Sequence, residues 1–224
     1  MASERAGLRG LYAVTPGIAD TARLAAAVEA AIAGGASLVQ YRAKDASPAL
    51  ALEQARTLAA ICRARSVPLI VNDSPELALA AGADGVHVGR DDADTRAARR
   101  LLPRGIIGVS CYDEPERARA AADAGADYVA IGSVFPSSTK PGAVAARLEL
   151  IARARDLSGL PVAAIGGITA ANAGRAIAAG ADMVAVISAV FDAADVRAAA
   201  AAVAQLFESP RTGTRDARAQ PRPL

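Results

Sequence analysis

The chain has very few of the residues on which several common functions depend. Only 3% of its 224 residues are aromatic, and tryptophan is absent. Binding of single-stranded nucleic acid by base stacking is therefore not expected. The net charge of +2 comes entirely from residues 208–224, where four arginines accompany two carboxylates, and the rest of the chain is neutral. We expect no surface for a nucleic-acid backbone and no nucleic-acid partner.

Cysteine and long apolar runs are scarce too. Cys62 and Cys111 are too few for a disulfide framework or a zinc site, so we interpret both as small core residues. No apolar run approaches the ~18 residues of a membrane span, and residues 1–10 contain no apolar signal segment. We expect a cytoplasmic protein without a membrane partner. Residues 1–10 are interpreted as an N-terminal extension, and the Arg- and Pro-rich segment 208–224 as a disordered tail.

Lysine, asparagine and histidine occur at very few positions. Of 25 basic residues only Lys44 and Lys140 are lysines, the asparagines are Asn72 and Asn172, and the single histidine is His87. A lysine retained in an arginine-rich chain indicates a site that needs a compact point charge. Asn172 falls within an expected helix and needs no functional interpretation.

Eight short apolar runs alternate with Ala- and Arg-rich stretches of helical spacing. The runs span 11–14, 38–42, 69–72, 85–89, 106–110, 128–133, 162–167 and 183–188. Helices are expected, for example, over 21–34, 48–65, 114–125 and 192–207. Prolines at expected helix starts are Pro48, Pro75 and Pro115, and glycines at expected helix ends are Gly34, Gly82, Gly125 and Gly180. The repeats AGADGV, AGADYV and AGADMV each predict a helix end followed directly by a parallel strand.

This pattern predicts an α/β fold, a (β/α)8 TIM barrel formed by residues 11–207 as a single domain. An open doubly wound sheet is the alternative. That fold needs a glycine fingerprint after its first strand, and the VTPG sequence found there does not provide one.

Polar residues collect at one end of the expected strands. Strand beginnings carry Ala, Gly, Pro, Leu and Val, whereas strand ends carry charges and hydroxyls. Active sites of such barrels lie at the carboxyl ends of the strands. The residues expected there are Gln40, Arg42, Lys44, Asn72, Asp73, Arg90, Asp92, Ser110, Ser137, Ser138, Thr139, Lys140, Gly167 and Ser188.

These side chains predict a site for phosphorylated ligands. Arg42, Lys44 and Lys140, together with the hydroxyls, form an anion-binding wall. Asp73 and Asp92 lie among these cations, and Mg²⁺ typically takes one or two carboxylates and completes its shell with phosphate oxygens and water. A second anion site is expected at the ends of the last two strands, where backbone N–H groups are available.

Each residue also has a purely structural interpretation. Arg42 can form an ordinary ion pair with Asp45 or Asp73 at the barrel rim. The sequence Asp73-Ser74-Pro75 can equally be a helix N-cap with proline at N1, and Asp92 can cap the helix after the fourth strand. Segment 137–140 can be a solvated turn. His87 lies inside a strand, so a satisfied core histidine is favoured over a catalyst.

Five motifs occur in order along the chain: QYRAKD, VNDSPELALAAGADGVHVGRDD, GVSCY, GADYVAIGSVFPSSTKPG and PVAAIGGIT. Together they closely resemble the thiamine-phosphate synthase family, and the resemblance runs from about Leu11 to about Ala189. Members of that family join 4-amino-5-hydroxymethyl-2-methylpyrimidine, carried as its diphosphate, to thiazole phosphate. The products are thiamine phosphate and pyrophosphate.

The resemblance implies a role for each matching residue. The pyrimidine diphosphate would contact Gln40, Tyr41, Arg42, Ala43, Lys44, Asn72, Ser110 and Lys140. The residues implied to be catalytic are Arg42, Lys44, Ser110 and Lys140. The Mg²⁺ ligands would be Asp73 and Asp92. The thiazole phosphate would contact Ser137, Ser138, Thr139, Gly167, Ile187 and Ser188.

The implied chemistry needs no side-chain nucleophile, because pyrophosphate leaves a ring-stabilised cation that the thiazole nitrogen captures. This agrees with the lack of a recognisable Cys-His or Ser-His-Asp pattern. Two positions depart from the family: Arg90 stands where Gln is usual, and Ser137 where Thr is frequent.

Two alternatives remain. A thiazole tautomerase relative would act on the thiazole phosphate alone, but its pattern has a histidine near the position where this chain has Tyr112. A non-catalytic sensor of thiamine-pathway ligands could share the barrel. The partners expected for the synthase are its two small-molecule substrates, and a homodimer is compatible with these features.

Overall fold

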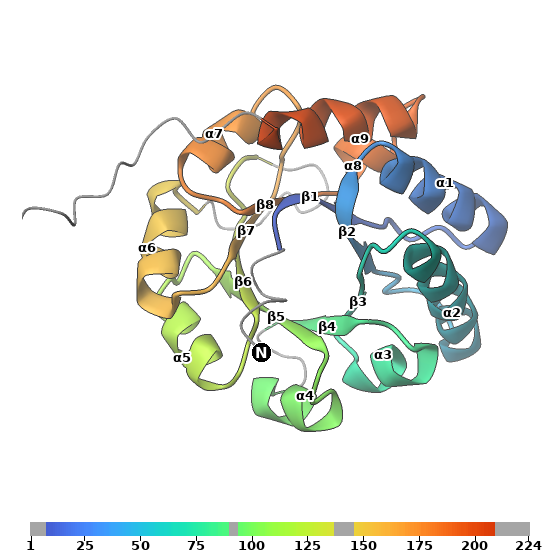
Figure 1. Cartoon of the computed structure of the whole chain (residues 1–224), viewed down its shortest axis with the longest axis horizontal. Coiled ribbons are helices and arrows are strands. Elements are labelled where there is room, and N and C mark those ends of the chain that lie inside the picture. The colour runs from blue at the N-terminus through green and yellow to red at the C-terminus, as the bar shows by residue number, and fades with distance from the viewer. Residues whose placement is uncertain (1–7, 90–93, 137–145, 209–224) are drawn as a thin grey trace, which may run out of the picture.

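A closed barrel of parallel strands forms the centre of the molecule, as the computed structural model in Figure 1 shows. The structure describes residues 8–89, 94–136 and 146–208. The strands follow one another around the ring in sequence order, and the last pairs with the first. The predicted (β/α)8 barrel is thus confirmed, and the open sheet is wrong. The strands are β1 (Gly10–Val14), β2 (Ala36–Tyr41), β3 (Leu69–Asn72), β4 (Gly85–Val88), β5 (Ile106–Tyr112), β6 (Tyr128–Gly132), β7 (Val162–Ile165) and β8 (Met183–Val186).

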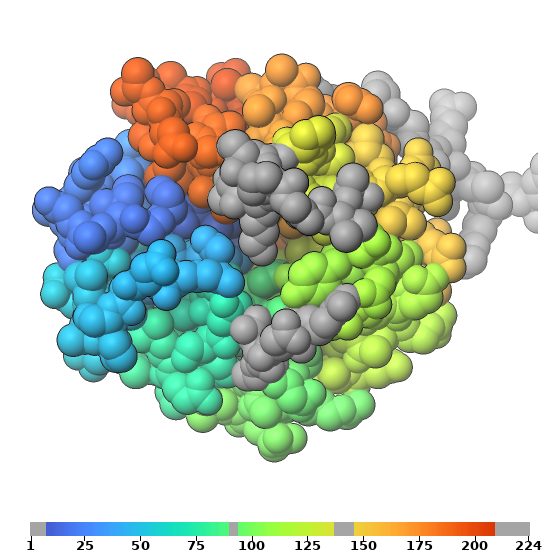
Figure 2. Space-filling model, turned by 180° about the vertical axis from the view of Figure 1, so that it is seen from behind, coloured from blue at the N-terminus to red at the C-terminus, as the bar shows by residue number. Residues whose placement is uncertain are grey.

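Helices cover the outside of the barrel. In Figure 2, which views the molecule from behind, successive parts of the chain follow one another around a rounded body. The helices are α1 (Thr21–Ala33), α2 (Pro48–Ala64), α3 (Pro75–Ala81), α4 (Thr95–Leu101), α5 (Arg117–Asp123), α6 (Glu149–Ser158), α7 (Ala173–Ala178), α8 (Ser188–Phe191), α9 (Val196–Ala204) and the 3-10 turn η2 (Gln205–Phe207). Within the described ranges, none of them combines the length and apolar character needed to cross a bilayer.

Two of the three helix starts predicted from proline are confirmed. Ser47 and Ser74 cap α2 and α3 with their hydroxyls, and a proline follows each cap, where its missing N–H costs nothing. The third start is wrong, because α5 begins two residues after Pro115. The cap of α4 is Asp94, whose carboxylate accepts a hydrogen bond from the backbone N–H of Ala97 at 3.2 Å.

The aspartate of each AGAD repeat ties two strands together. Asp84, Asp127 and Asp182 precede β4, β6 and β8. Their carboxylates accept hydrogen bonds from backbone N–H groups at the start of β3, β5 and β7, namely those of Leu69, Ile107 and Val162, at 2.8, 2.8 and 2.9 Å. Asp127 and Asp182 also pair with Arg99 and Arg155 of the outer helices. The repeat thus sets the strand register at the amino ends of the barrel.

The buried side chains form two clusters separated by the wall of strands. The larger cluster lies between strands and helices and includes both cysteines, so the interpretation of Cys62 and Cys111 as core residues is confirmed. The smaller cluster fills the lumen and includes Leu8, Tyr12, Tyr128 and Met183. The barrel therefore begins slightly before residue 11, because Leu8 packs in the lumen and β1 starts at Gly10.

Candidate active site

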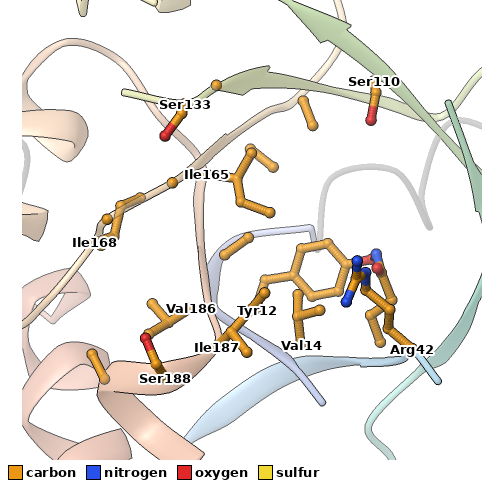
Figure 3. Close-up of a pocket in the computed structure, with 18 of the residues that line it drawn as sticks. Tyr12, Val14, Arg42, Ser110, Ser133, Ile165, Ile168, Val186, Ile187 and Ser188 are labelled. Carbon is orange, nitrogen blue, oxygen red and sulfur yellow. The ribbon is translucent and has the colours of Figure 1, made fainter. Parts of the chain in front are cut away.

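A cavity of about 330 Å³ opens among the carboxyl ends of the strands. All eight strands, or the residues that directly follow them, contribute to its lining (Figure 3). The one-sided polarity of the sequence predicted this location. The lining residues are Tyr12, Val14, Gln40, Arg42, Asn72, His87, Ser110, Tyr112, Ala130, Gly132, Ser133, Pro136, Ala163, Ile165, Gly166, Gly167, Ile168, Thr169, Ala185, Val186, Ile187, Ser188 and Ala189.

Strand β2 sends alternate side chains to opposite sides of the barrel wall. Gln40 and Arg42 line the cavity. Tyr41 and Ala43 belong to the outer cluster, where the Tyr41 hydroxyl donates to Oε1 of Gln54 at 2.9 Å. The Tyr41 and Ala43 side chains therefore face the helices, because successive side chains of a strand point to opposite faces. The expected contact of these two residues with substrate stays a prediction.

The expected row of three polar side chains ends after Arg42. β2 stops at Tyr41, and Lys44 is exposed in a turn and does not line the cavity. The hydroxyl of the buried Thr15 accepts from the backbone N–H of Arg42 at 2.9 Å and donates to its carbonyl at 3.4 Å. This contact fixes the Arg42 backbone at the rim. Within the described residues Arg42 forms no ion pair, so the suggested structural pairing with Asp45 or Asp73 is wrong.

Strand β3 delivers an amide to the cavity and a carboxylate beside it. Asn72 lines the cavity, whereas Asp73 lies half-buried at the rim and is not among the lining residues. Asp73 adopts a left-handed backbone with φ 67°, and its N–H donates to the His87 carbonyl at 2.8 Å. The structural interpretation of Asp73-Ser74-Pro75 as a helix N-cap with proline at N1 is confirmed, and Ser74 is the cap. A non-glycine residue held in this conformation is a frequent feature of functional sites.

Several expected site residues lie outside the described part of the chain. These are Arg90, Asp92, Ser137, Ser138, Thr139 and Lys140. No group of three or more His, Cys, Asp or Glu side chains suited to a metal occurs in the described ranges. A pair formed by Asp73 and Asp92 thus stays a prediction.

A continuous hydrogen-bonded row crosses the base of the cavity from β2 to β5. Nε2 of Gln40 donates to the Tyr12 hydroxyl at 2.6 Å, and the Tyr12 and Tyr128 hydroxyls are 2.7 Å apart. Nδ1 of His87 lies 2.9 Å from the Tyr128 hydroxyl, and Nε2 lies 2.8 Å from Oγ of Ser110. Both ring nitrogens are partnered, so the interpretation of His87 as satisfied is confirmed, although the residue also lines the cavity.

The opposite side of the cavity is built from β7, β8 and the residues after them. Gly167 has φ 60°, and a Cβ there would lie 2.1 Å from the Pro136 carbonyl oxygen, so the position needs glycine. Asn172 holds this loop: its Oδ1 accepts from the N–H of Thr169 at 2.8 Å, and its Nδ2 donates to the carbonyl of Gly167 at 2.9 Å. Ser188 begins the short helix α8 at the cavity edge.

The cavity therefore has two unlike walls. In Figure 3, Arg42 and Ser110 lie on one side and Ser133, Ile168 and Ser188 on the other. The first wall carries charge and polar side chains. The second offers small residues, loop backbone and hydroxyls. Such a cavity can hold a strongly anionic group on one side and a smaller polar group on the other.

Comparison with known proteins identifies the family to which the chain belongs. The profile described as "Thiamine monophosphate synthase" matches residues 11–190. The chain belongs to the thiamine monophosphate synthase family. A thiamine-phosphate synthase of Aromatoleum aromaticum is 58% identical over 203 residues, which cover 90% of this chain and 98% of the relative. A thiamine-phosphate synthase of Thiobacillus denitrificans is 58% identical over 199 residues, 88% of this chain and 94% of the relative.

Solved structures support membership of the thiamine monophosphate synthase family. The thiamine phosphate pyrophosphorylase of Pyrococcus furiosus superposes with a TM-score of 0.82 at 36% identity, covering 92% of this chain and 98% of that one. A 3-hexulose-6-phosphate synthase, with a TM-score of 0.64 and 22% identity, shares the fold alone. The chain is an enzyme, a transferase of thiamine biosynthesis.

Sequence reasoning missed Tyr12, Tyr128 and Thr15. Tyr12 lies in the middle of β1 and Tyr128 at the start of β6, away from the carboxyl ends of the strands. The chain has only four tyrosines, and this scarcity, like that of lysine and asparagine, is the signal in the sequence that points to them. Thr15 acts through its contacts with the backbone, and no sequence motif indicates such a role.

Proposed function

We propose that this transferase catalyses the Mg²⁺-dependent transfer of the pyrimidinylmethyl group from 4-amino-5-hydroxymethyl-2-methylpyrimidine diphosphate to the nitrogen of thiazole phosphate. The products are thiamine phosphate and pyrophosphate. The observation that carries the proposal is the two-walled cavity, because it offers separate places for two phosphorylated reactants within one space of about 330 Å³. The relatives' names point to the same product.

The polar wall suits the diphosphate. Arg42 brings a guanidinium that is not engaged by a carboxylate among the described residues, and its backbone is fixed by Thr15. Guanidinium groups bind phosphate oxygens in a bidentate way. Asn72 and Ser110 add neutral donors on the same side. Lys44, exposed in the turn after β2, and Lys140, outside the described residues, are proposed to add positive charge to the binding of the diphosphate.

The donor chemistry near β3 and β4 fits Mg²⁺. Asp73 supplies a carboxylate at the rim beside this wall, and Asp92, outside the described residues, is the proposed second ligand. Mg²⁺ favours one or two carboxylates together with substrate phosphate oxygens. When bound, the ion supplies neutralisation of the diphosphate charge.

The wall formed by β7 and β8 suits the thiazole phosphate. Gly167 leaves its backbone accessible because it has no side chain, and Asn172 holds the loop in place. The loops after the last two strands, together with a short extra helix, are the usual phosphate site of this fold, and α8 corresponds to that helix. Ile187 and Ser188 line the cavity there, opposite Arg42.

The reaction requires bond cleavage at one wall and bond formation at the centre. The methylene C–O bond breaks, and its electron pair leaves with pyrophosphate. The thiazole nitrogen then donates its lone pair to the ring-stabilised methylene cation. The residues contribute by positioning both reactants and by stabilising charge on the leaving group. Ser110 contacts Nε2 of His87, as the serine of a hydrolase contacts its catalytic histidine. The other ring nitrogen, Nδ1, contacts the Tyr128 hydroxyl, whereas a hydrolase has a carboxylate in that place, so the contact does not indicate a serine nucleophile.

The proposal is tested by incubating the purified protein with both substrates, with Mg²⁺ or with a chelator, and separating the products by chromatography. We expect thiamine phosphate and one equivalent of pyrophosphate when Mg²⁺ is present. Isomerised thiazole phosphate alone would identify a tautomerase. Binding of either substrate without turnover would identify a sensor. Either of these results would refute the synthase.

The metal assignment predicts a specific defect in Asp73→Asn. The variant keeps the shape of the side chain and loses its charge, so we expect the Mg²⁺ concentration for half-maximal rate to rise at least about tenfold. The measurement is the initial rate as a function of Mg²⁺ concentration. An unchanged midpoint would remove Asp73 from the metal site.

A further inference from the structure

We propose that the row Gln40–Tyr12–Tyr128–His87–Ser110, here called the lumen relay, has a fixed direction that holds His87 with its hydrogen on Nε2. The relay thereby turns the Ser110 hydroxyl into a hydrogen-bond donor aimed into the cavity. The direction of the hydrogen bonds is inferred from the contacts and the burial of these residues. The role of Ser110 as a donor to substrate rests on the proposed function.

The direction begins at Gln40, whose amide nitrogen can donate but not accept. The Tyr12 oxygen accepts this hydrogen bond at 2.6 Å, so the hydrogen of Tyr12 is directed to the Tyr128 oxygen, 2.7 Å away. The hydrogen of Tyr128 is then directed to Nδ1 of His87 at 2.9 Å. Nδ1 must accept, so the imidazole carries its hydrogen on Nε2 and donates it to Oγ of Ser110 at 2.8 Å. The serine hydrogen remains for a ligand.

Burial makes this ordering strict. Tyr12 and Tyr128 are 1% and 0% exposed and Gln40 is 5% exposed, so water has little access to the links between them. Burial raises the pKa of both tyrosines above their ordinary value, and each therefore remains a phenol with one hydrogen to give. If two hydrogens or two lone pairs met at any link, a buried polar group would be left unsatisfied, which is costly.

The fold reserves space for the central link of the relay. Gly108 lies opposite Tyr128 in the register of β5 and β6. A Cβ at position 108 would lie 2.1 Å from Cζ of Tyr128 and 2.5 Å from Nδ1 of His87. The two rings can approach only because this residue has no side chain. This is a second feature, independent of the hydrogen bonds, that preserves the contact.

The direction has a chemical consequence. A serine nucleophile needs a histidine nitrogen with a free lone pair to take its proton. In the lumen relay Nε2 of His87 already bears a hydrogen, so it cannot deprotonate Ser110. Ser110 instead acts as a preorganised donor to an oxygen of the departing diphosphate. Tyr12, Tyr128 and His87 are positioning residues, because they act through Ser110.

The single histidine of the chain makes the tautomer directly measurable. Protein labelled with ¹⁵N-histidine gives one imidazole spin system, and the couplings to the ring C–H hydrogens identify which nitrogen is protonated. In the ligand-free wild-type protein we expect a hydrogen on Nε2 and a bare Nδ1. A hydrogen on Nδ1, or a signal averaged between the tautomers, would overturn the proposal.

The decisive variant is Gln40→Glu, because a carboxylate can only accept. At about pH 8.5, far above the ordinary carboxyl pKa of about 4.3, the glutamate is ionised and each link should reverse. We expect the hydrogen of His87 to move to Nδ1. Ser188→Ala, across the cavity and outside the relay, should keep the wild-type tautomer. A Gln40→Glu protein with the hydrogen still on Nε2 would contradict a direction set by Gln40.

The catalytic arm uses Tyr128→Phe, which removes one hydroxyl and keeps the ring. We expect kcat to fall about tenfold, with the KM of each substrate changed less than about threefold, as for a lost transition-state contact. A wild-type kcat would remove the relay from catalysis. If the wild-type protein forms no thiamine phosphate at all, the proposed function is wrong. The direction of the lumen relay is decided separately, by the protonation state of His87 in the NMR spectrum.

Discussion

A single added methyl group at Gly108 tests how tightly the lumen is filled. The Cβ of Gly108→Ala would meet Cζ of Tyr128 at 2.1 Å and Nδ1 of His87 at 2.5 Å. Both are atoms of buried rings, so relief requires movement of whole rings. Overpacking of this kind costs about 1–3 kcal/mol, and losing the Tyr128–His87 hydrogen bond adds about 0.5–1.5 kcal/mol. We therefore expect the free energy of unfolding to fall by about 2–4 kcal/mol.

Urea unfolding, followed by circular dichroism, measures this change, and the thermal midpoint should fall by roughly 5–15 °C. Gly174→Ala is the matched control, because that glycine lies in α7 and a Cβ there meets no atom within 4 Å. The control should be unchanged or more stable by up to about 1 kcal/mol. If Gly108→Ala unfolds within about 0.5 kcal/mol of wild type, the lumen is not packed as described.

Three further predictions concern single side chains. Arg42→Ala should lower kcat about 10²–10³-fold in steady-state assays, whereas Arg119→Ala, on the exposed face of α5, should not; equal rates for the two would exclude a role of Arg42 in charge stabilisation. Lys140→Ala, outside the described residues, should lose about 10²–10³-fold in rate, and unchanged turnover would remove it from the site. Burial raises the pKa of the Cys62 and Cys111 thiols to about 12, so at about pH 8 they should be alkylated only after unfolding; rapid labelling of folded protein would contradict this burial.

The barrel was predictable because its signals are local and repeated. Each buried strand is a short apolar run, and each run follows a glycine or proline that ends the preceding segment. Helix boundaries were harder, since an Ala- and Arg-rich stretch contains few stops. Residues 114–125 were expected as one helix, yet α5 spans Arg117–Asp123. The turn before it is set by a 2.9 Å bond from the N–H of Glu114 to the carbonyl of Cys111.

The candidate site was predictable where side chains follow strand ends, and not where a tertiary contact decides the backbone. Gln40 and Arg42 reach the cavity as the period of two requires. Lys44 does not, because the hydroxyl of Thr15 takes both backbone groups of Arg42 and β2 has already ended. No pattern within residues 38–45 contains this contact. The lumen relay was missed for a related reason, since its members come from five different strands.

The scarcity of aromatic residues also explains why the barrel has room for two reactants. A barrel of eight strands is ordinarily just wide enough to be filled by its own side chains. Here Ala130, Ala163 and Ala185 line the cavity from β6, β7 and β8, so the side chains on this side fill little of the lumen. Tyr12 and Tyr128, the large rings of the lumen, lie at the base, where their hydroxyls join the relay. Small residues thus create the volume, and the relay provides its polar floor. A larger side chain in place of any of these alanines would extend into the space that the reactants need. The small side chains of this composition are therefore a requirement of the proposed reaction.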